Sequence, residues 1–122
     1  MTDVKRRVRL RSRSEFAAAI GGRRFHQGRA LVGLAIPSLA PEHRIGVTVS
    51  RNIKGAIERN RARRRLREVA RTALLADDSP LRQVGIRYDV VLIAQRRILE
   101  MPFAELKAEA SQAALRLANT KP

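Results

Sequence analysis

A long basic segment near the middle of the chain limits the possible folds more than any other part of the sequence. From Asn52 to Ala76 it contains no proline and consists mainly of Arg, Ala, Leu and Glu, residues that favour a helix. With about 100° between successive residues, one narrow arc of this helix carries Ala62, Leu66, Val69 and Ala73. The opposite side carries Asn60, Arg61, Arg64, Arg67 and Arg71. One face is therefore expected to pack against the fold, and the other to be free to bind.

Positive charge is concentrated on this segment. Residues 51 to 71 hold nine basic and two acidic side chains, whereas the whole chain has 26 basic and 11 acidic residues and a net charge of +15. The commonest explanation of such a run is a solvated helix face, but solvated faces usually mix both signs. Here like charges are stacked at helical spacing, which costs roughly a few tenths of a kcal/mol per pair. An anionic partner is expected to compensate for this repulsion.

Arginine greatly outnumbers lysine in the segment, which favours nucleic acid as that partner. A planar guanidinium grips phosphate oxygens with two hydrogen bonds and can stack on bases, whereas an ammonium acts as a point charge. RNA is favoured over DNA because the sequence shows no helix-turn-helix, zinc-finger or zipper pattern.

The length and composition of the chain limit the number of domains, the cellular location and the capacity for metal binding. A chain of 122 residues with 44% hydrophobic residues can bury one modest core, so one domain over residues 1–122 is expected, with frayed ends at 1–9 and 119–122. No run approaches the roughly 18–20 apolar residues of a membrane span, and a secretory signal is absent, so a cytoplasmic location is expected. Cysteine is absent, and His26 and His43 lack metal-ligand spacing, so no metal site is expected and both are interpreted as surface histidines.

The other elements follow from local patterns. Ser12 and Glu15 form a capping-box pattern ahead of a short helix over 16–20, which Gly21-Gly22 is expected to end in a left-handed conformation. Strands are expected over 30–36 and 45–49, and a central strand buried on both faces over 88–94. Pro102 opens a last helix, whose predicted inward stripe is Phe103, Leu106, Ala110, Ala113 and Leu117. This order indicates helices packed on a small sheet in a mixed α/β sandwich.

Residues 49–68 closely resemble the signature of the bacterial ribonuclease P protein family. Arg59-Asn60-Arg61, followed by Arg63-Arg64 and Arg67-Glu68, matches the RNR motif of that family. The flanking helix and strands agree too, so the resemblance covers nearly the whole chain. It implies an α/β (α+β) two-layer sandwich of the ribosomal protein S5 domain 2-like type, a small mixed sheet with three helices. It also implies a left-handed βαβ crossover through the long basic helix, whereas a right-handed one is the default.

The resemblance further implies an RNA-binding subunit of a ribonucleoprotein that removes the 5′ leader from precursor tRNA. The RNA subunit, with bound Mg²⁺, would hydrolyse the phosphodiester, so no catalytic residue is expected in this chain. The implied partners are ribonuclease P RNA and precursor tRNA, in a 1:1 complex of RNA with monomeric protein, without DNA or membrane. The residues expected to bind RNA are Arg51, Lys54, Arg59, Asn60, Arg61, Arg63, Arg64, Arg67 and Arg71.

A separate cleft between the first helix and the sheet is implied for the single-stranded leader, lined here by Phe16, Ile20 and Leu34. The family often has several aromatic residues in this cleft, and only Phe16 is aromatic here. Because stacking on an aromatic ring contributes about 1–3 kcal/mol per base, we expect weaker leader binding with less base preference. Without the resemblance, a plain core residue is the favoured interpretation of Phe16, and Phe25 and Phe103 are interpreted as core residues. Lys54-Gly55 also departs from the family pattern, so contacts from that turn are the least secure.

Two other classes of protein could also carry a concentrated positive charge of this kind. A ribosomal or other RNA-scaffold protein is also small, basic and free of cysteine, and only the motif spacing separates it. A DNA-compacting protein or a membrane-active basic helix would need neither the buried strand from Val90 to Ala94 nor packing of the basic helix on the rest of the fold.

Overall fold

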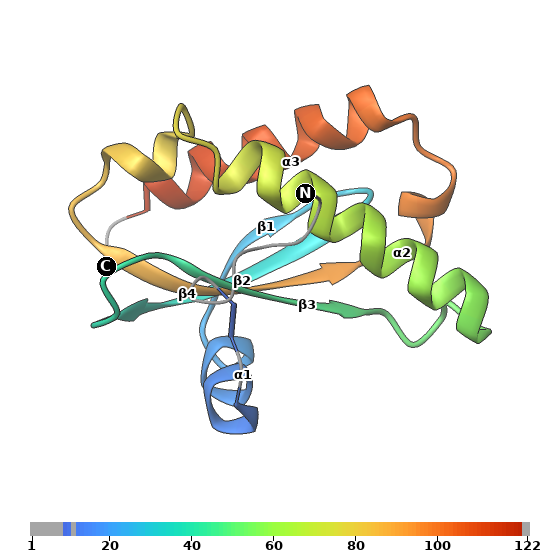
Figure 1. Cartoon of the computed structure of the whole chain (residues 1–122), viewed down its shortest axis with the longest axis horizontal. Coiled ribbons are helices and arrows are strands. Elements are labelled where there is room, and N and C mark those ends of the chain that lie inside the picture. Colours follow the sequence, from blue (N-terminus) through green and yellow to red (C-terminus); the bar gives the residue numbers. More distant parts are fainter. Residues whose placement is uncertain (1–8, 11, 121–122) are drawn as a thin grey trace.

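The computed structural model describes residues 9–10 and 12–120 and contains a four-stranded sheet with three α-helices. Its elements are α1 (Arg13–Ile20), β1 (Arg23–Gln27), β2 (Leu31–Ser38), β3 (Arg44–Val49), α2 (Ala56–Val69), the π-helical turn η2 (Ala70–Leu74), the 3₁₀ turn η3 (Pro80–Gln83), β4 (Arg87–Ala94), the 3₁₀ turn η4 (Arg96–Leu99) and α3 (Phe103–Ala118). Helices α2 and α3 cover one face of the sheet, and α1 alone crosses the other (Figure 1). The predicted mixed sandwich is confirmed.

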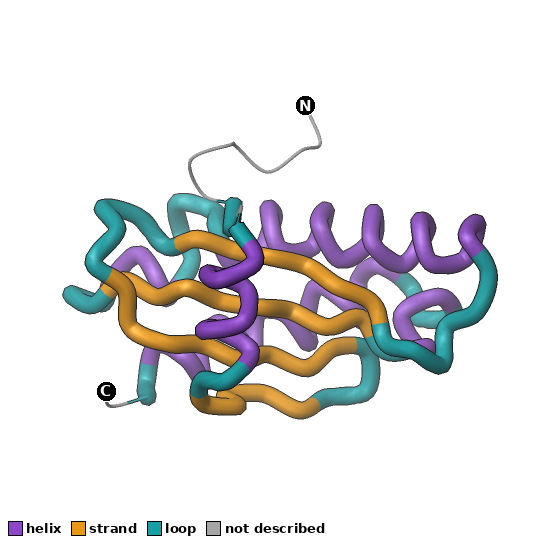
Figure 2. The backbone as a smooth tube through the Cα atoms, turned by 90° about the horizontal axis from the view of Figure 1, so that it is seen from below, coloured by secondary structure: helices purple, strands orange, loops and turns teal. Residues whose placement is uncertain are grey.

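The strand order is β1-β2-β4-β3, with β3 and β4 parallel and the other pairs antiparallel. The parallel pair is joined through α2. Figure 2 looks at the face that α1 crosses, so α2 lies behind the sheet; β3 runs to the right and β4 lies below it. A chain that returns behind the sheet in this way makes a left-handed crossover, as the family resemblance implied, against the usual preference.

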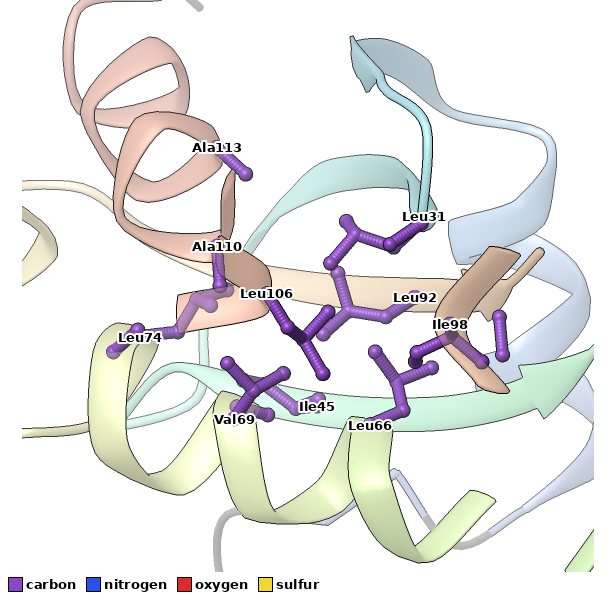
Figure 3. Close-up of a cluster of buried hydrophobic side chains, with 14 of the residues drawn as sticks. Leu31, Ile45, Leu66, Val69, Leu74, Leu92, Ile98, Leu106, Ala110 and Ala113 are labelled. Atoms are coloured by element: carbon purple, nitrogen blue, oxygen red, sulfur yellow. The ribbon is translucent and has the colours of Figure 1, made fainter. Parts of the chain in front are cut away.

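The main core lies between the sheet and the layer of α2 and α3 (Figure 3). Leu66 and Val69 of α2 and Leu106 of α3 meet Leu92 of β4, and all four side chains are fully buried. Alternate residues of a strand point to opposite faces, so β4 also contributes Val91 to a smaller cluster with Leu10 and Ala19 under α1. Strand β4 is therefore buried on both faces, as its continuous apolar sequence predicted.

Helix α1 begins with the predicted capping box: the amide of Glu15 donates to Ser12 Oγ over 3.1 Å, and the amide of Ser12 donates to the Glu15 carboxylate over 3.1 Å. The expected left-handed glycine at its end is wrong. Gly21 has φ −76° and ψ −1°, and Gly55 is the glycine with positive φ within the described ranges. Gly22 serves packing instead, because a Cβ there would lie 2.4 Å from the carbonyl oxygen of Ala35 on β2.

Both histidines are buried, so their interpretation as surface residues is wrong. The ring of His26 lies 3.0 Å from the Glu109 carboxylate, on a helix 83 residues away in sequence. His43 Nδ1 accepts from the amide of Tyr88 over 3.0 Å, and its Nε2 lies 2.9 Å from the carbonyl of Leu81. These contacts fix loops to the core, and sequence spacing alone cannot reveal partners so far along the chain.

Two further features differ from what the sequence predicted. Strand β1 was not expected, since only Phe25 among its residues is a large apolar one. Phe103 belongs to no inward stripe, because its side chain is 38% exposed, while the other four predicted stripe residues are buried. The frayed ends lie partly outside the described residues; within them, Arg9 forms a bridge with Ile45, and the amide of Asn119 donates to Leu115.

Candidate nucleic-acid interface

Helix α2 divides into the two predicted faces. Ala62, Leu66 and Val69 are fully buried and Ala73, on the following turn, is 7% exposed. On the outer side, Asn60, Arg61 and Arg64 are exposed and Arg67 and Arg71 are partly buried. The division arises because the buried arc packs on β3, β4 and α3, which turns the opposite arc outward. The projection from sequence is confirmed; binding of RNA by these residues stays a prediction.

Arg59, the first residue of the RNR motif, is turned toward the main chain. Its guanidinium donates to the carbonyl oxygens of Ser50 over 3.0 Å and Ile53 over 2.9 Å, with a longer contact of 3.4 Å to that of Val49. These carbonyls lie at the end of β3 and in the turn that leads into α2. Arg59 therefore fixes this turn, which presents the exposed side chains of Arg51 and Lys54.

Two other arginines of α2 hold the connection between β4 and α3. Arg61 donates to the carbonyl of Leu99 over 3.1 Å, and Arg65 donates to the carbonyl of Met101. Arg65 was not predicted as a site residue, and its buried Nε has no hydrogen-bond partner within the described structure. No sequence pattern could have identified this pairing, since the carbonyls belong to main chain 36 and 38 residues away.

The remaining predicted residues of the helix face outward. Arg63 donates to the side-chain oxygen of Asn60 over 2.9 Å, and Arg71 pairs with Glu68 one turn earlier. Arg64 is exposed and makes no side-chain hydrogen bond or ion pair with any described residue. The outward cationic stripe is thus narrower than predicted and centres on Arg63, Arg64 and Arg67, with Asn60 among them.

The predicted leader-cleft residues lie on the face of the sheet that α1 crosses. The Phe16 ring rests on Gly46 of β3, where an added Cβ would lie 2.4 Å from the ring. Ile20 is 47% exposed, and Leu34, which pairs in register with Val91, is only 8% exposed. Phe16 and Leu34 thus pack where α1 crosses, and Leu34 offers little surface to a ligand.

Beside α1, the floor of this face is a row of four residues that the sequence did not predict, of which Gln27 is exposed and Val32 is buried. Thr48, Ile93, Val32 and Gln27 are aligned across the four strands. This row lies two residues nearer than Gly46 to the carboxyl ends of β3 and β4, where none of the described helices crosses this face of the sheet (Figure 2). Thr48 and Ile93 are partly exposed. The four residues come from four strands that are far apart in the sequence, so the row is visible only once the register of strand pairing is known.

An ion-pair network anchors α1 beside this floor. Arg44 of β3 donates two hydrogen bonds, of 2.8 and 2.7 Å, to the buried carboxylate of Asp89 on β4, and a third of 2.7 Å to Glu15 of α1. The hydrogen bonds to Asp89 are the main cause of a raised pKa of Arg44. A charged arginine that joins two strands and a helix fixes the angle at which α1 crosses the sheet.

No cluster of three or more His, Cys, Asp or Glu side chains that could hold a metal ion occurs in the described part of the chain. Likewise, none of the described helices is long and apolar enough to cross a membrane.

A cationic helix on one face of a small mixed sheet, with a single short helix crossing the other, defines a class of small basic α/β proteins. The family model described as Ribonuclease P matches residues 4–118. The chain therefore belongs to the ribonuclease P protein family, as its resemblance to that family implied.

Known ribonuclease P proteins are similar to this chain over most of its length. The ribonuclease P protein component of Dehalococcoides mccartyi is 32% identical over 104 residues, which cover 85% of this chain and 79% of that protein. The corresponding protein of Acidothermus cellulolyticus is 35% identical over 117 residues, covering 94% and 92%. The structure of the Thermotoga maritima ribonuclease P protein has a TM-score of 0.69 at 22% identity, covering 88% of this chain and 96% of that one. That structure shares the fold.

Proposed function

We propose that this chain acts as the protein subunit of ribonuclease P, in the removal of the 5′ leader from precursor tRNA. The observation that carries the proposal is the outward arc of α2, on which Asn60, Arg63, Arg64 and Arg67 follow the RNR motif while the inner arc is buried. This arc would bind the catalytic RNA, and the floor beside α1 would bind the single-stranded leader of the substrate.

The RNA subunit would carry out the hydrolysis with Mg²⁺ bound mainly by RNA and substrate. The protein contributes binding free energy and positioning. Its guanidinium groups offset repulsion between the phosphates of two RNA molecules, and bound substrate is held with its cleavage site in place. Tethered arginines support this role indirectly, because Arg59, Arg61 and Arg65 keep the helix and its adjoining turns in one arrangement before RNA arrives.

The working particle is proposed to contain one monomeric copy of this protein and one RNA, in the cytoplasm, without a DNA or membrane partner. A stripe with like charges at helical spacing gains most from a folded RNA, whose phosphates lie close together.

The test is reconstitution with a bacterial ribonuclease P RNA at a Mg²⁺ concentration at which the RNA alone is nearly inactive. Leader removal from precursor tRNA should occur with the protein and fail without it. A variant with Arg64→Ala and Arg67→Ala should restore less activity than a variant with the exposed Lys107 of α3 changed to alanine. If the protein instead co-purifies with ribosomal RNA and does not lower the Mg²⁺ requirement, a scaffold role replaces this proposal.

A further inference from the structure

Helix α2 carries two acidic residues, and one of them lies in the middle of its outward arc. The two are Glu58 and Glu68. With about 100° between successive residues, Glu68 falls between Arg61 and Arg64 in projection. Glu58 falls beside the fully buried Ala62, away from the outward arc. A negative charge therefore stands within the surface proposed to bind RNA.

Glu68 holds the last arginine of the predicted cationic side of the helix. Its Oε1 accepts a hydrogen bond from Nη2 of Arg71, three residues later. The Nε of Arg71 is buried and has no hydrogen-bond partner within the described part of the chain. Arg71 thus forms one bond to a carboxylate where a guanidinium can form two, and the pair keeps it turned toward its own helix. It is less available to RNA than the exposed Arg64.

The fold gains little from the charge of Glu68. The side chains of Arg71 and Glu68 are 39% and 31% exposed, and ion pairs at such exposure contribute little to stability. Glutamine has the same length and nearly the same helix propensity as glutamate. A glutamine would therefore suit the helix about equally well, and the main effect of the negative charge is on whatever approaches the outward arc.

This charge disfavours phosphates at the centre of the arc. A phosphate that pairs with Arg61 or Arg64 comes close to the carboxylate of Glu68 and is repelled by it. RNA of arbitrary sequence binds a basic helix mainly through its phosphates. A folded RNA of fixed shape can instead present a 2′-hydroxyl or a base amino group, which donates a hydrogen bond to a carboxylate. One acidic side chain can therefore separate a specific RNA from the others.

We propose that Glu68 is a specificity-determining residue, which weakens the binding of unrelated RNA to the outward arc by repulsion and by occupying Arg71. The specific RNA meets Glu68 with a hydrogen-bond donor and loses little affinity. This inference rests on the proposed function, because the specific partner is taken to be ribonuclease P RNA. A chain with a net charge of +15 attracts every RNA without regard to sequence, so a residue that penalises the wrong ones has a clear role.

The experiment compares wild type with Glu68→Gln. The matched control, Glu58→Gln, removes the same charge from the same helix but outside the outward arc. Binding is titrated over a salt series with two probes, a bacterial ribonuclease P RNA and a short RNA duplex of arbitrary sequence.

For the duplex, Glu68→Gln should raise the affinity about five- to tenfold and steepen the salt slope by about 0.9, the value for one added phosphate contact. For ribonuclease P RNA, the affinity should change by less than about twofold, since a hydrogen bond to the donor is kept. Glu58→Gln should leave both affinities within about twofold of wild type, because salt screens charges beyond about 8 Å.

The double variant Glu68→Gln/Arg71→Ala tests the part played by Arg71. Its salt slope with the duplex should return to about that of wild type, because the added contact comes from Arg71. A slope that stays steep without Arg71 overturns the occupied arginine. Equal gains with both RNAs, or no gain with the duplex, overturn Glu68 as a specificity residue and leave it an ordinary partner within the helix.

The failure of the proposed function has a different appearance. Wild-type protein that does not prefer ribonuclease P RNA to the duplex contradicts that function itself, whatever Glu68 does. Wild type that prefers it, with Glu68→Gln equally selective, contradicts only the present inference. Equal thermal unfolding of the variants and wild type shows that all of these proteins are folded.

Discussion

The guanidinium of Arg59 donates a hydrogen bond of 3.0 Å to the carbonyl of Ser50, nine residues earlier, and so closes the turn between β3 and α2. Together with the bond to Ile53, it makes the first arginine of the RNR motif a main-chain anchor in the protein without RNA. Its importance for RNA binding would then be indirect, through the turn that carries Arg51 and Lys54.

Replacement of Arg59 by alanine should therefore lower the free energy of unfolding as well as RNA affinity. Hydrogen bonds to a charged donor contribute about 1.5–3 kcal/mol, and Arg59 is only partly buried, so we expect about 1–2 kcal/mol in urea denaturation. Arg59→Lys is the control, because an ammonium keeps the charge but cannot span both carbonyls. If lysine restores stability completely, the fork of hydrogen bonds is not what stabilises the turn.

Replacement of Arg64 and Arg67 together by alanine should weaken assembly with the catalytic RNA without unfolding the protein. At about 0.7–0.9 units of slope per phosphate contact, the salt dependence of assembly should flatten by about one to two units. The measurement is a binding titration at several salt concentrations. A slope equal to that of wild type would contradict the outward stripe as the contact surface.

Replacement of Leu66 by alanine should instead lower the stability of the protein and leave its contacts with RNA unchanged. Its side chain is fully buried between α2 and the sheet, and truncation of a buried leucine costs about 2–5 kcal/mol. Thermal unfolding should shift strongly, while the salt slope of RNA assembly, measured where the variant is still folded, should stay that of wild type. Unaltered stability would show that the inner arc is not packed as described.

Replacement of Gly46 by alanine should displace the Phe16 ring, because the new Cβ would lie 2.4 Å from it. Overpacking of this kind costs about 1–3 kcal/mol, and α1 should lose its fit beside the floor. The check is a double-mutant cycle with Phe16→Leu, which makes room. The two changes should be strongly coupled; simple additivity would mean that the ring does not rest on this glycine.

Stability should also depend on pH through His43. Burial is the main cause of its lowered pKa, and the cations Arg87 and Arg82 lower it further, against the raising effect of the Leu81 carbonyl. Protonation would also break the hydrogen bond that Nδ1 accepts from Tyr88. Because the folded pKa lies below the unfolded value of 6.5, this stability is fully present above pH 6.5 and is lost as the pH falls through the folded pKa.

Urea denaturation between pH 5 and 8 would measure this dependence, with His43→Gln as the comparison. The slope of stability against pH below about 6.5 should be shallower in the variant. Parallel curves would assign the acid sensitivity to other groups.

Local patterns predicted the parts of this fold that depend on neighbouring residues. The arcs of α2, the capping box of Ser12 and the buried run of β4 all follow from spacing within one element. Strand β1 could not be predicted in the same way, because it forms by pairing with β2 and has little apolar sequence of its own.

The candidate RNA-binding site could also be predicted only in part. The motif predicted which arginines are grouped on α2, but not that Arg59, Arg61 and Arg65 would be bound to main-chain carbonyls. Those carbonyls belong to other elements and have no side-chain signal. The same holds for His26, whose carboxylate partner Glu109 lies on α3.

Strand β4 allows the two faces of the sheet to be compared by mutation within a single element. Tyr88, Val90 and Leu92 point into the main core, whereas Asp89 and Val91 point to the opposite face, under α1. Alternate positions of one strand therefore report on two different properties. In an alanine scan along this strand, the effects should alternate from one residue to the next. Changes at residues that face the main core should lower thermal stability alone, whereas changes at residues that face α1 should also weaken binding of the substrate.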